Sequence, residues 1–105
     1  MKWMTMMKYS PQGAAAIKSA GGAARRDAVA EVFGQTGVTL LHWWHGGTPE
    51  WDVIMIVDAE PDYAVQASFT LATFATGDML RATTIPLVDP EAFDAALVPA
   101  HPSAE

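Results

Sequence analysis

The chain lacks cysteine and has few basic residues, and each shortage excludes a class of function. Without cysteine there can be no disulfide, no thiolate nucleophile and no cysteine-ligated metal. The same absence fits a reducing cytoplasm, which is the location we expect. Six lysine and arginine residues stand against twelve acidic residues, giving a net charge of −6. Phosphate contacts need clustered basic residues, so neither nucleic acid nor an anionic membrane surface is expected as a partner.

Long apolar runs are missing as well. No segment approaches the roughly 20 apolar residues of a membrane-spanning helix. The apolar start of the chain ends at Lys8, which is too short for the hydrophobic region of a signal peptide. We therefore expect a protein that is not embedded in a membrane.

What the chain does contain indicates a globular domain. Half of its 105 residues are hydrophobic and 17% are charged, a composition typical of proteins with a packed core. The length suits one such core. We expect residues 1–98 to form the domain and residues 99–105, which have little to bury, to form a flexible C-terminal tail.

One stretch, Trp51–Asp58, is apolar throughout between its two aspartates. A strand with one solvent-exposed face would alternate apolar and polar side chains, and this stretch does not. Both of its faces should therefore be covered. A chain of this length has few helices for that purpose, so the pattern predicts self-association.

Hydrophobic spacing and turn residues divide the rest of the chain into strands and helices. Strands are expected at residues 3–9, 38–45, 51–58 and 79–88, and helices at 11–35, 62–75 and 91–97. Gly21-Gly22 should kink or break the first helix. The turn at residues 46–50 makes the second and third strands a hairpin. The second helix should bury a row formed by Val65, Phe69, Ala72 and Leu71.

The order of these elements predicts an α+β fold of the ferredoxin-like βαββαβ type. Its four-stranded antiparallel sheet would carry the helices on one face, with a short helix added at the C-terminus. The other face would be apolar over several hundred Å². This area is at or above the largest apolar patch that a soluble monomer normally exposes. Packing two such sheets face to face would make a homodimer or a higher homo-oligomer.

Several blocks of residues stand out in order along the chain. They are Tyr9–Gly13, Gly21–Val29, Trp51–Val57, Pro61-Asp62, Gly77 and Arg81–Thr84. Together they resemble the GYD-domain family over residues 2–97. The family takes its name from a Gly-Tyr-Asp triplet before the third strand, which here reads Glu50-Trp51-Asp52. The tryptophan keeps the aromatic ring but lacks the tyrosine hydroxyl.

The resemblance implies the dimeric α/β-barrel class of ferredoxin-like proteins, in agreement with the patterning. Proteins that share this fold include cofactor-free monooxygenases, haem-binding enzymes, isomerases, dehydratases and ligand-binding subunits. Choosing a reaction from that range would be analogy by fold alone.

The tetrapeptide His42-Trp43-Trp44-His45 is the segment most suggestive of chemistry. Two histidines invite a metal site, but residues three apart on a strand point to opposite faces, and no cysteine completes a ligand set. We therefore expect no metal. His42 with Trp44 on one face, and Trp43 with His45 on the other, is the favoured arrangement. His42 is then a candidate general base or a buried, hydrogen-bonded imidazole.

Five further residues are candidates for a site. Asp52 begins a strand that should be buried, so its carboxylate needs donors; it is a second catalytic candidate, with a structural role as the alternative. Arg81 is the partner we expect for it. Tyr9, Trp51, Arg26 and Arg81, with Trp44, are the expected ligand-binding residues. For Arg26 the alternative is a surface ion pair.

The sequence favours binding of a small apolar or aromatic molecule in a sheet-lined cavity of a homodimer. Four tryptophans and six methionines would make such an interior wide and deformable. Cofactor-independent chemistry is compatible with this, and the sequence does not decide whether the protein is an enzyme. Two alternatives stay open: a non-catalytic oligomeric structural module, and a haem-binding protein with a histidine as axial ligand. We expect no cofactor, with haem as the one alternative.

Overall fold

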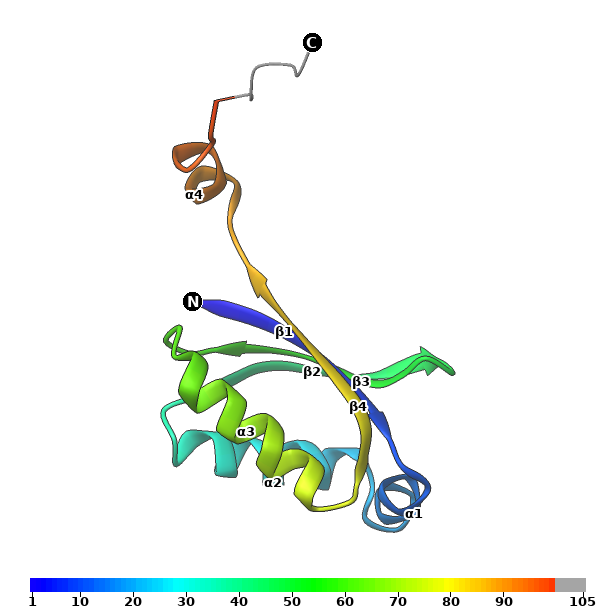
Figure 1. Ribbon diagram of the computed structural model, residues 1–105. Coiled ribbons are helices and arrows are strands. Elements are labelled where there is room, and N and C mark those ends of the chain that lie inside the picture. The colour runs from blue at the N-terminus through cyan, green and yellow to red at the C-terminus, as the bar shows by residue number, and fades with distance from the viewer. Residues whose placement is uncertain (100–105) are drawn as a thin grey trace.

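The computed structural model describes residues 1–99 and builds them into one sheet with helices against it (Figure 1). The elements are β1 (Lys2–Tyr9), α1 (Pro11–Ala20), α2 (Gly22–Gly34), β2 (Thr39–Thr48), β3 (Trp51–Asp58), α3 (Tyr63–Ala75), β4 (Met79–Leu87) and α4 (Pro90–Ala95). The strands are antiparallel in the order β2-β3-β1-β4. Helices α1, α2 and α3 all lie on one face of the sheet (Figure 1). The predicted ferredoxin-like α+β fold is confirmed.

The core lies on the face of the sheet that the helices cover. Its buried apolar side chains, all from strands, are Trp3, Met7, Tyr9, Val53, Met55, Val57 and Met79. Side chains alternate along a strand, so every second residue of the apolar run in β3 enters this core. Full burial of a side chain of this kind contributes about 1.5–3 kcal/mol. The strands therefore supply the buried side chains of the core, and Ile17, Phe33 and Phe74 of the helices pack against them.

The opposite face of the sheet is bare in the described part of the chain. It carries Met4, Met6, Ile54, Ile56 and Ile85, which the strand register places side by side. Met4 pairs with Ile56 on one side and Ile85 on the other, and Met6 pairs with Ile54. No element covers them (Figure 1). The helices thus cover the apolar side chains on one face of β3 and leave those on the other face uncovered. The predicted self-association, which would cover them, stays a prediction.

The helical segment after β1 breaks where the sequence predicted. Ser10 caps α1 by accepting a hydrogen bond from the Gly13 N–H, and Pro11 takes the first helical position. Gly21 has φ of 89°, a backbone conformation that favours glycine. Gly22 then allows α2 to approach the His45 imidazole, which a Cβ at that position would overlap.

The β2–β3 hairpin is longer than expected. We predicted a turn at residues 46–50, but β2 continues to Thr48 and the turn is confined to Pro49 and Glu50. Gly46 can stay in the strand because it lacks a side chain: a Cβ there would overlap the Trp51 carbonyl oxygen. The register shifts between His45 and Thr48, which accommodates this glycine-rich end.

Helix α3 begins as expected but buries a different row of residues. The Asp62 carboxylate accepts hydrogen bonds from two backbone N–H groups in the first turn, each 3.1 Å long. The predicted row is wrong for Val65, Leu71 and Ala72, which are exposed; Leu71 is 74% exposed. The residues that face the sheet are partly buried, and they are Gln66, Phe69, Thr73 and Phe74. Leu71 and Ala72 lie away from the sheet, whereas Val65 lies at the rim of the space between α3 and the sheet.

The C-terminal part of the described chain stands apart from the rest. Asp89 caps α4 through a 2.8 Å hydrogen bond from the Ala92 N–H, yet α4 projects well beyond the sheet on its bare side (Figure 1). Its Phe93 is exposed, and so are Leu97 and Val98 just after it. The radius of gyration is 16.8 Å, against about 13 Å for a compact domain of this length. Of the predicted tail, residues 100–105 lie outside the described residues.

No helix within residues 1–99 combines the length and the apolar composition needed to cross a bilayer.

Candidate functional site

The bare face of the sheet gathers some of the residues predicted to carry chemistry. The His42 and Trp44 rings stack there, with centroids 5.2 Å apart and planes 10° from parallel. His42 lies opposite Ile56, and Trp44 lies opposite Ile54. Both are exposed, Trp44 by 53%. His42 is thus a surface residue, with no hydrogen bond between its ring and the described residues.

The two histidines lie on opposite faces, as the spacing predicted. His45 pairs with Val53 of the core, and its Nε2 accepts a 3.3 Å hydrogen bond from the Trp43 indole N–H. The rings of Trp43 and His45 meet edge to face with centroids 6.0 Å apart. Within residues 1–99, no three His, Asp or Glu residues gather closely enough to hold a metal ion.

Asp52 connects β3 to β1. Its Oδ2 accepts a 2.9 Å hydrogen bond from the Tyr9 backbone N–H and lies 3.3 Å from the Lys8 Nζ. The carboxylate is partly buried, so these donors compensate for its lost hydration. Arg81 is not among them, and the predicted Asp52–Arg81 pair is wrong. Lys8 takes that role: it pairs with Arg81 on β4, and the residue before it, Met7, pairs with Val53 next to Asp52 on β3.

Arg81 instead spans the sheet to the start of β3. Its Nη2 donates a 2.9 Å hydrogen bond to the Glu50 carbonyl oxygen. The guanidinium carbon lies 4.9 Å from the centre of the Trp51 ring, a cation–π contact worth about 0.5–1 kcal/mol at an exposed site. Arg81 and Trp51 therefore hold each other where β3 begins.

Tyr9 and Arg26 do not join this group. Tyr9 is 6% exposed and lies under the helices. Arg26 is on the outer surface of α2, where its Nε lies 3.0 Å from an Asp27 carboxylate oxygen. This is the surface ion pair that was the alternative for Arg26. Its neighbour Arg25 is the arginine that turns toward the sheet.

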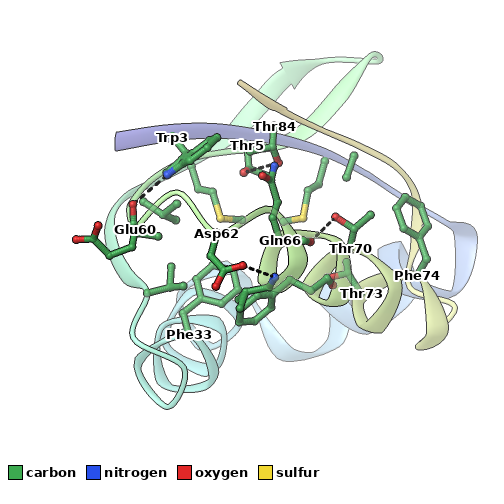
Figure 2. Close-up of a pocket in the computed structure, with 18 residues that line it drawn as sticks. Trp3, Thr5, Phe33, Glu60, Asp62, Gln66, Thr70, Thr73, Phe74 and Thr84 are labelled. Atoms are coloured by element: carbon green, nitrogen blue, oxygen red, sulfur yellow. Dashed lines mark hydrogen bonds between the residues drawn. The ribbon is translucent and has the colours of Figure 1, made fainter. Parts of the chain in front are cut away.

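A pocket lies on the other side of the sheet, between the strands and α3 (Figure 2). Its volume is about 130 Å³. The apolar part of its lining includes Trp3, Met7, Met55, Phe33, Phe69 and Phe74. Phe33 of α2 and Phe69 of α3 meet edge to face, with ring centroids 5.6 Å apart, and close one side. The pocket exists because α3 crosses the sheet without burying any residue fully.

A few polar groups converge on this pocket. The hydroxyls of Thr5 and Thr84, on adjacent strands, lie 3.1 Å apart and share a hydrogen bond. The Gln66 side chain extends from α3 toward the sheet (Figure 2), and within residues 1–99 its amide makes no hydrogen bond to another side chain. Asp62 lies at the edge, where its carboxylate is held by the helix cap. The pocket is thus mainly apolar, with neutral hydrogen-bonding groups inside and the carboxylates of Glu60 and Asp62 at its edge.

The GYD domain family model matches residues 3–97 of the 105-residue chain. The chain belongs to the GYD domain family. The search of curated proteins finds no match, and the search of solved structures finds none either.

In this GYD domain the triplet Glu50-Trp51-Asp52 joins three strands. The Glu50 carbonyl and the Trp51 ring hold Arg81 of β4, while the Asp52 carboxylate holds the end of β1. These contacts run through the backbone, the aromatic face and the carboxylate, and none of them needs a tyrosine hydroxyl. The contacts of Trp51 thus explain why tryptophan can stand at this place in the triplet.

Sequence reasoning missed the pocket beneath α3. It placed a ligand cavity on the sheet face away from the helices, whereas the pocket of this GYD domain lies on the helix side. A signal was available: Gln66, Thr70 and Thr73 follow helical spacing and all face the pocket. Polar residues at inward positions indicate that a helix stands over a space instead of packing directly on the sheet.

Haem does not fit this pocket. A volume of about 130 Å³ is too small for a porphyrin. Neither His42 nor His45 lines it, so its lining within residues 1–99 contains no histidine to serve as the usual proximal ligand.

Proposed function

We propose that this protein binds a small, mainly apolar or aromatic molecule in the pocket between the sheet and α3. The observation that carries the proposal is the pocket's combination of aromatic walls with a few neutral polar groups. A cavity of roughly 150 Å³ is known to accept benzene, and this one measures about 130 Å³. A single aromatic ring therefore matches the space.

A polar substituent on that ring would be recognised by the groups already described. The Thr5 and Thr84 hydroxyls can each donate or accept, and the Gln66 amide can do both. A phenol or a cyclic ketone would suit them better than an anionic compound, because no cation lies within the lining among residues 1–99. Glu60 and Asp62 are the ionisable groups at its edge, and both are exposed, so binding is better supported than catalysis.

Methionine methyl NMR tests the location of the ligand. Met7 and Met55 line the pocket, while Met4 and Met6 lie on the bare face. Titration with 4-methylphenol should shift the Met7 and Met55 methyl signals in a saturable way and leave those of Met4 and Met6 in place. Shifts confined to Met4 and Met6 would move the site to the bare face. No saturable shift at any methionine would overturn the proposal.

A pair of alanine variants provides the control. Ala82 faces the pocket from β4, so Ala82→Leu should fill the space and weaken binding of 4-methylphenol at least about tenfold. Ala67 is exposed on α3, so Ala67→Leu adds the same side chain without entering the pocket and should leave affinity unchanged. Equal loss in both variants would contradict the assigned position.

A homodimer formed through the bare faces is the second element of the proposal. Two observations favour it: the row of uncovered apolar side chains across the sheet, and the exposed α4 segment that projects on the same side (Figure 1). A second copy stacked on the bare face would meet that segment as well. If the pocket binds nothing, this assembly role becomes the better account of the protein.

Light scattering coupled to size exclusion tests the dimer. Ile54→Glu places a charge in the middle of the bare face and should yield monomers, since an unpaired charge is costly to bury. Leu71→Glu, on the exposed side of α3, should leave the dimer intact. A wild-type protein that is monomeric at micromolar concentration removes this part of the proposal.

A further inference from the structure

A second cavity lies at the end of β1, between β1 and the helices α1 and α2. Its volume is about 190 Å³. Most of its wall consists of glycine, alanine and isoleucine from the two helices, and its polar lining residues are Tyr9, Arg25 and Asp78. None of its lining residues belongs to the pocket beneath α3. The two cavities are therefore separate sites.

Two polar atoms at this cavity lack a hydrogen-bond partner among residues 1–99. They are the Tyr9 hydroxyl and the Arg25 Nε, and both are shielded from solvent. Tyr9 as a whole is only 6% exposed. A buried polar group without a partner costs free energy, and native proteins rarely leave one so. Two such groups on one cavity indicate that something with acceptor atoms belongs there.

The charges around the cavity indicate which class of ligand it would bind. Arg26 is neutralised by Asp27 on the surface, whereas Arg25 makes no ion pair with a described residue. Burial raises the pKa of Tyr9 above its ordinary value, although the nearby Arg25 guanidinium, through its charge and its closeness as a donor, acts in the opposite direction. At neutral pH the hydroxyl is therefore protonated and available as a donor. A guanidinium and a phenol hydroxyl together form a pair of donors for an oxyanion.

We infer that this cavity binds the carboxylate of a small monocarboxylic acid, with the carboxylate at Tyr9 and Arg25 and a short apolar tail against the alanine walls. Arginine matches a carboxylate in shape as well as charge. Asp78 also lines the cavity, and its Oδ1 is held by the Gln12 amide 3.2 Å away. Its negative charge offsets part of the attraction of Arg25, so a ligand with one negative charge is favoured over one with two, such as phosphate or a dicarboxylate. The walls offer the tail no polar partner.

Calorimetric titration with butyrate tests the inference, in a buffer whose ionic strength is held constant with chloride. Butyrate should bind saturably, while butanol, which has the same tail without the charge, and inorganic phosphate should bind at least about tenfold more weakly. Binding of butanol as tight as that of butyrate would overturn the inference, and so would tighter binding of phosphate.

Three variants locate the binding. Tyr9→Phe and Arg25→Gln should each weaken butyrate at least about tenfold, whereas Arg26→Gln, the matched surface control, should leave it unchanged. Equal weakening by Arg25→Gln and Arg26→Gln would indicate non-specific attraction and contradict the site. Because this cavity shares no lining residue with the one beneath α3, 4-methylphenol should still shift the Met7 methyl in all three variants.

Stability without ligand separates a binding role from a structural one. Since the Tyr9 hydroxyl is unpaired, Tyr9→Phe should unfold at the same temperature as the parent or higher. A lower unfolding temperature would mean that the hydroxyl is satisfied within the protein, and the inference would fail.

Discussion

The Asp52 carboxylate accepts a 2.9 Å hydrogen bond from the backbone N–H of Tyr9, on the neighbouring strand. This contact falls where β1 leaves its regular pairing with β4, at a register shift between Lys8 and Tyr9. The N–H of Tyr9 is thus satisfied by a side chain on β3. The arrangement helps to hold Tyr9 with its ring under α1 and α2.

Removal of the Asp52 carboxylate should destabilise the fold. Asp52→Ala leaves the Tyr9 N–H and the Lys8 ammonium without their acceptor, and a hydrogen bond to a charged group contributes about 1.5–3 kcal/mol. We expect the free energy of unfolding, measured with urea, to fall by about this amount. Asp52→Asn keeps an acceptor oxygen and should lose less. A change within about 0.5 kcal/mol for Asp52→Ala, the range of ordinary surface substitutions, would contradict the structural role.

Two helical glycines should respond in opposite directions to alanine. At Gly13 an added Cβ would overlap the backbone carbonyl oxygen of Asp78, which cannot move without shifting the start of β4. Gly13→Ala should therefore lower the thermal unfolding temperature. Nothing lies near an added Cβ at Gly34, in the last turn of α2, so Gly34→Ala should stabilise the protein by about 0.4–1 kcal/mol. Similar effects of the two substitutions would argue against the close approach of α1 to β4.

Much of this fold could be predicted because its signals are local. The apolar run Trp51–Asp58 forms β3 with the expected bounds, Gly21 breaks the helix, and Ser10 and Asp89 cap the helices that follow them. Each of these depends on one residue's conformational preference or on a simple period.

The candidate site was harder to predict, because it depends on distances between elements. Arg25 faces the sheet and Arg26 does not because of how α2 is rotated about its axis. The two residues are neighbours, 100° apart on the helix, and the sequence alone does not show which of them faces inward. The register shift between Leu40 and His42 could not be predicted, because the sequence of β2 is apolar on both faces and gives no sign of an extra residue. The height of α3 above the sheet decided whether Phe69 would fill a core or line a pocket, and composition does not encode that height.

Alkaline pH should reduce stability through Tyr9. Burial raises the pKa of Tyr9 above 10.0 in the folded protein, so the unfolded chain ionises first. The free energy of unfolding should then decrease as pH rises from about 10 toward the folded-state pKa. The chain has two tyrosines, so Tyr63→Phe leaves Tyr9 as the only chromophore for a tyrosinate absorbance titration. A midpoint at or below 10 would contradict the burial of the hydroxyl, and Tyr9→Phe supplies the baseline.

Deletion of the residues after Val88 should separate folding from assembly. Within residues 1–99, α4 lies away from the sheet and the other helices (Figure 1). The deletion should therefore change the free energy of unfolding of the monomer by less than about 0.5 kcal/mol. If α4 packs on a second copy, the deletion removes the buried side chains of Phe93 and Leu97, each worth about 1.5–3 kcal/mol. The dissociation constant of the dimer should then rise at least tenfold. Analytical ultracentrifugation measures this. Tyr63→Ser, an exposed change on α3, is the control, and an unchanged dissociation constant after the deletion would place α4 outside the interface.

Among residues 1–99, the seven buried apolar side chains of the core all come from strands. The sheet can therefore keep its integrity while the residues of the helical layer vary. One scaffold of this kind could exchange the chemistry of its cavities through substitutions in α1, α2 and α3 alone, without altering the contacts that bind strand to strand. Diversity of ligands within a family would then need no diversity of core.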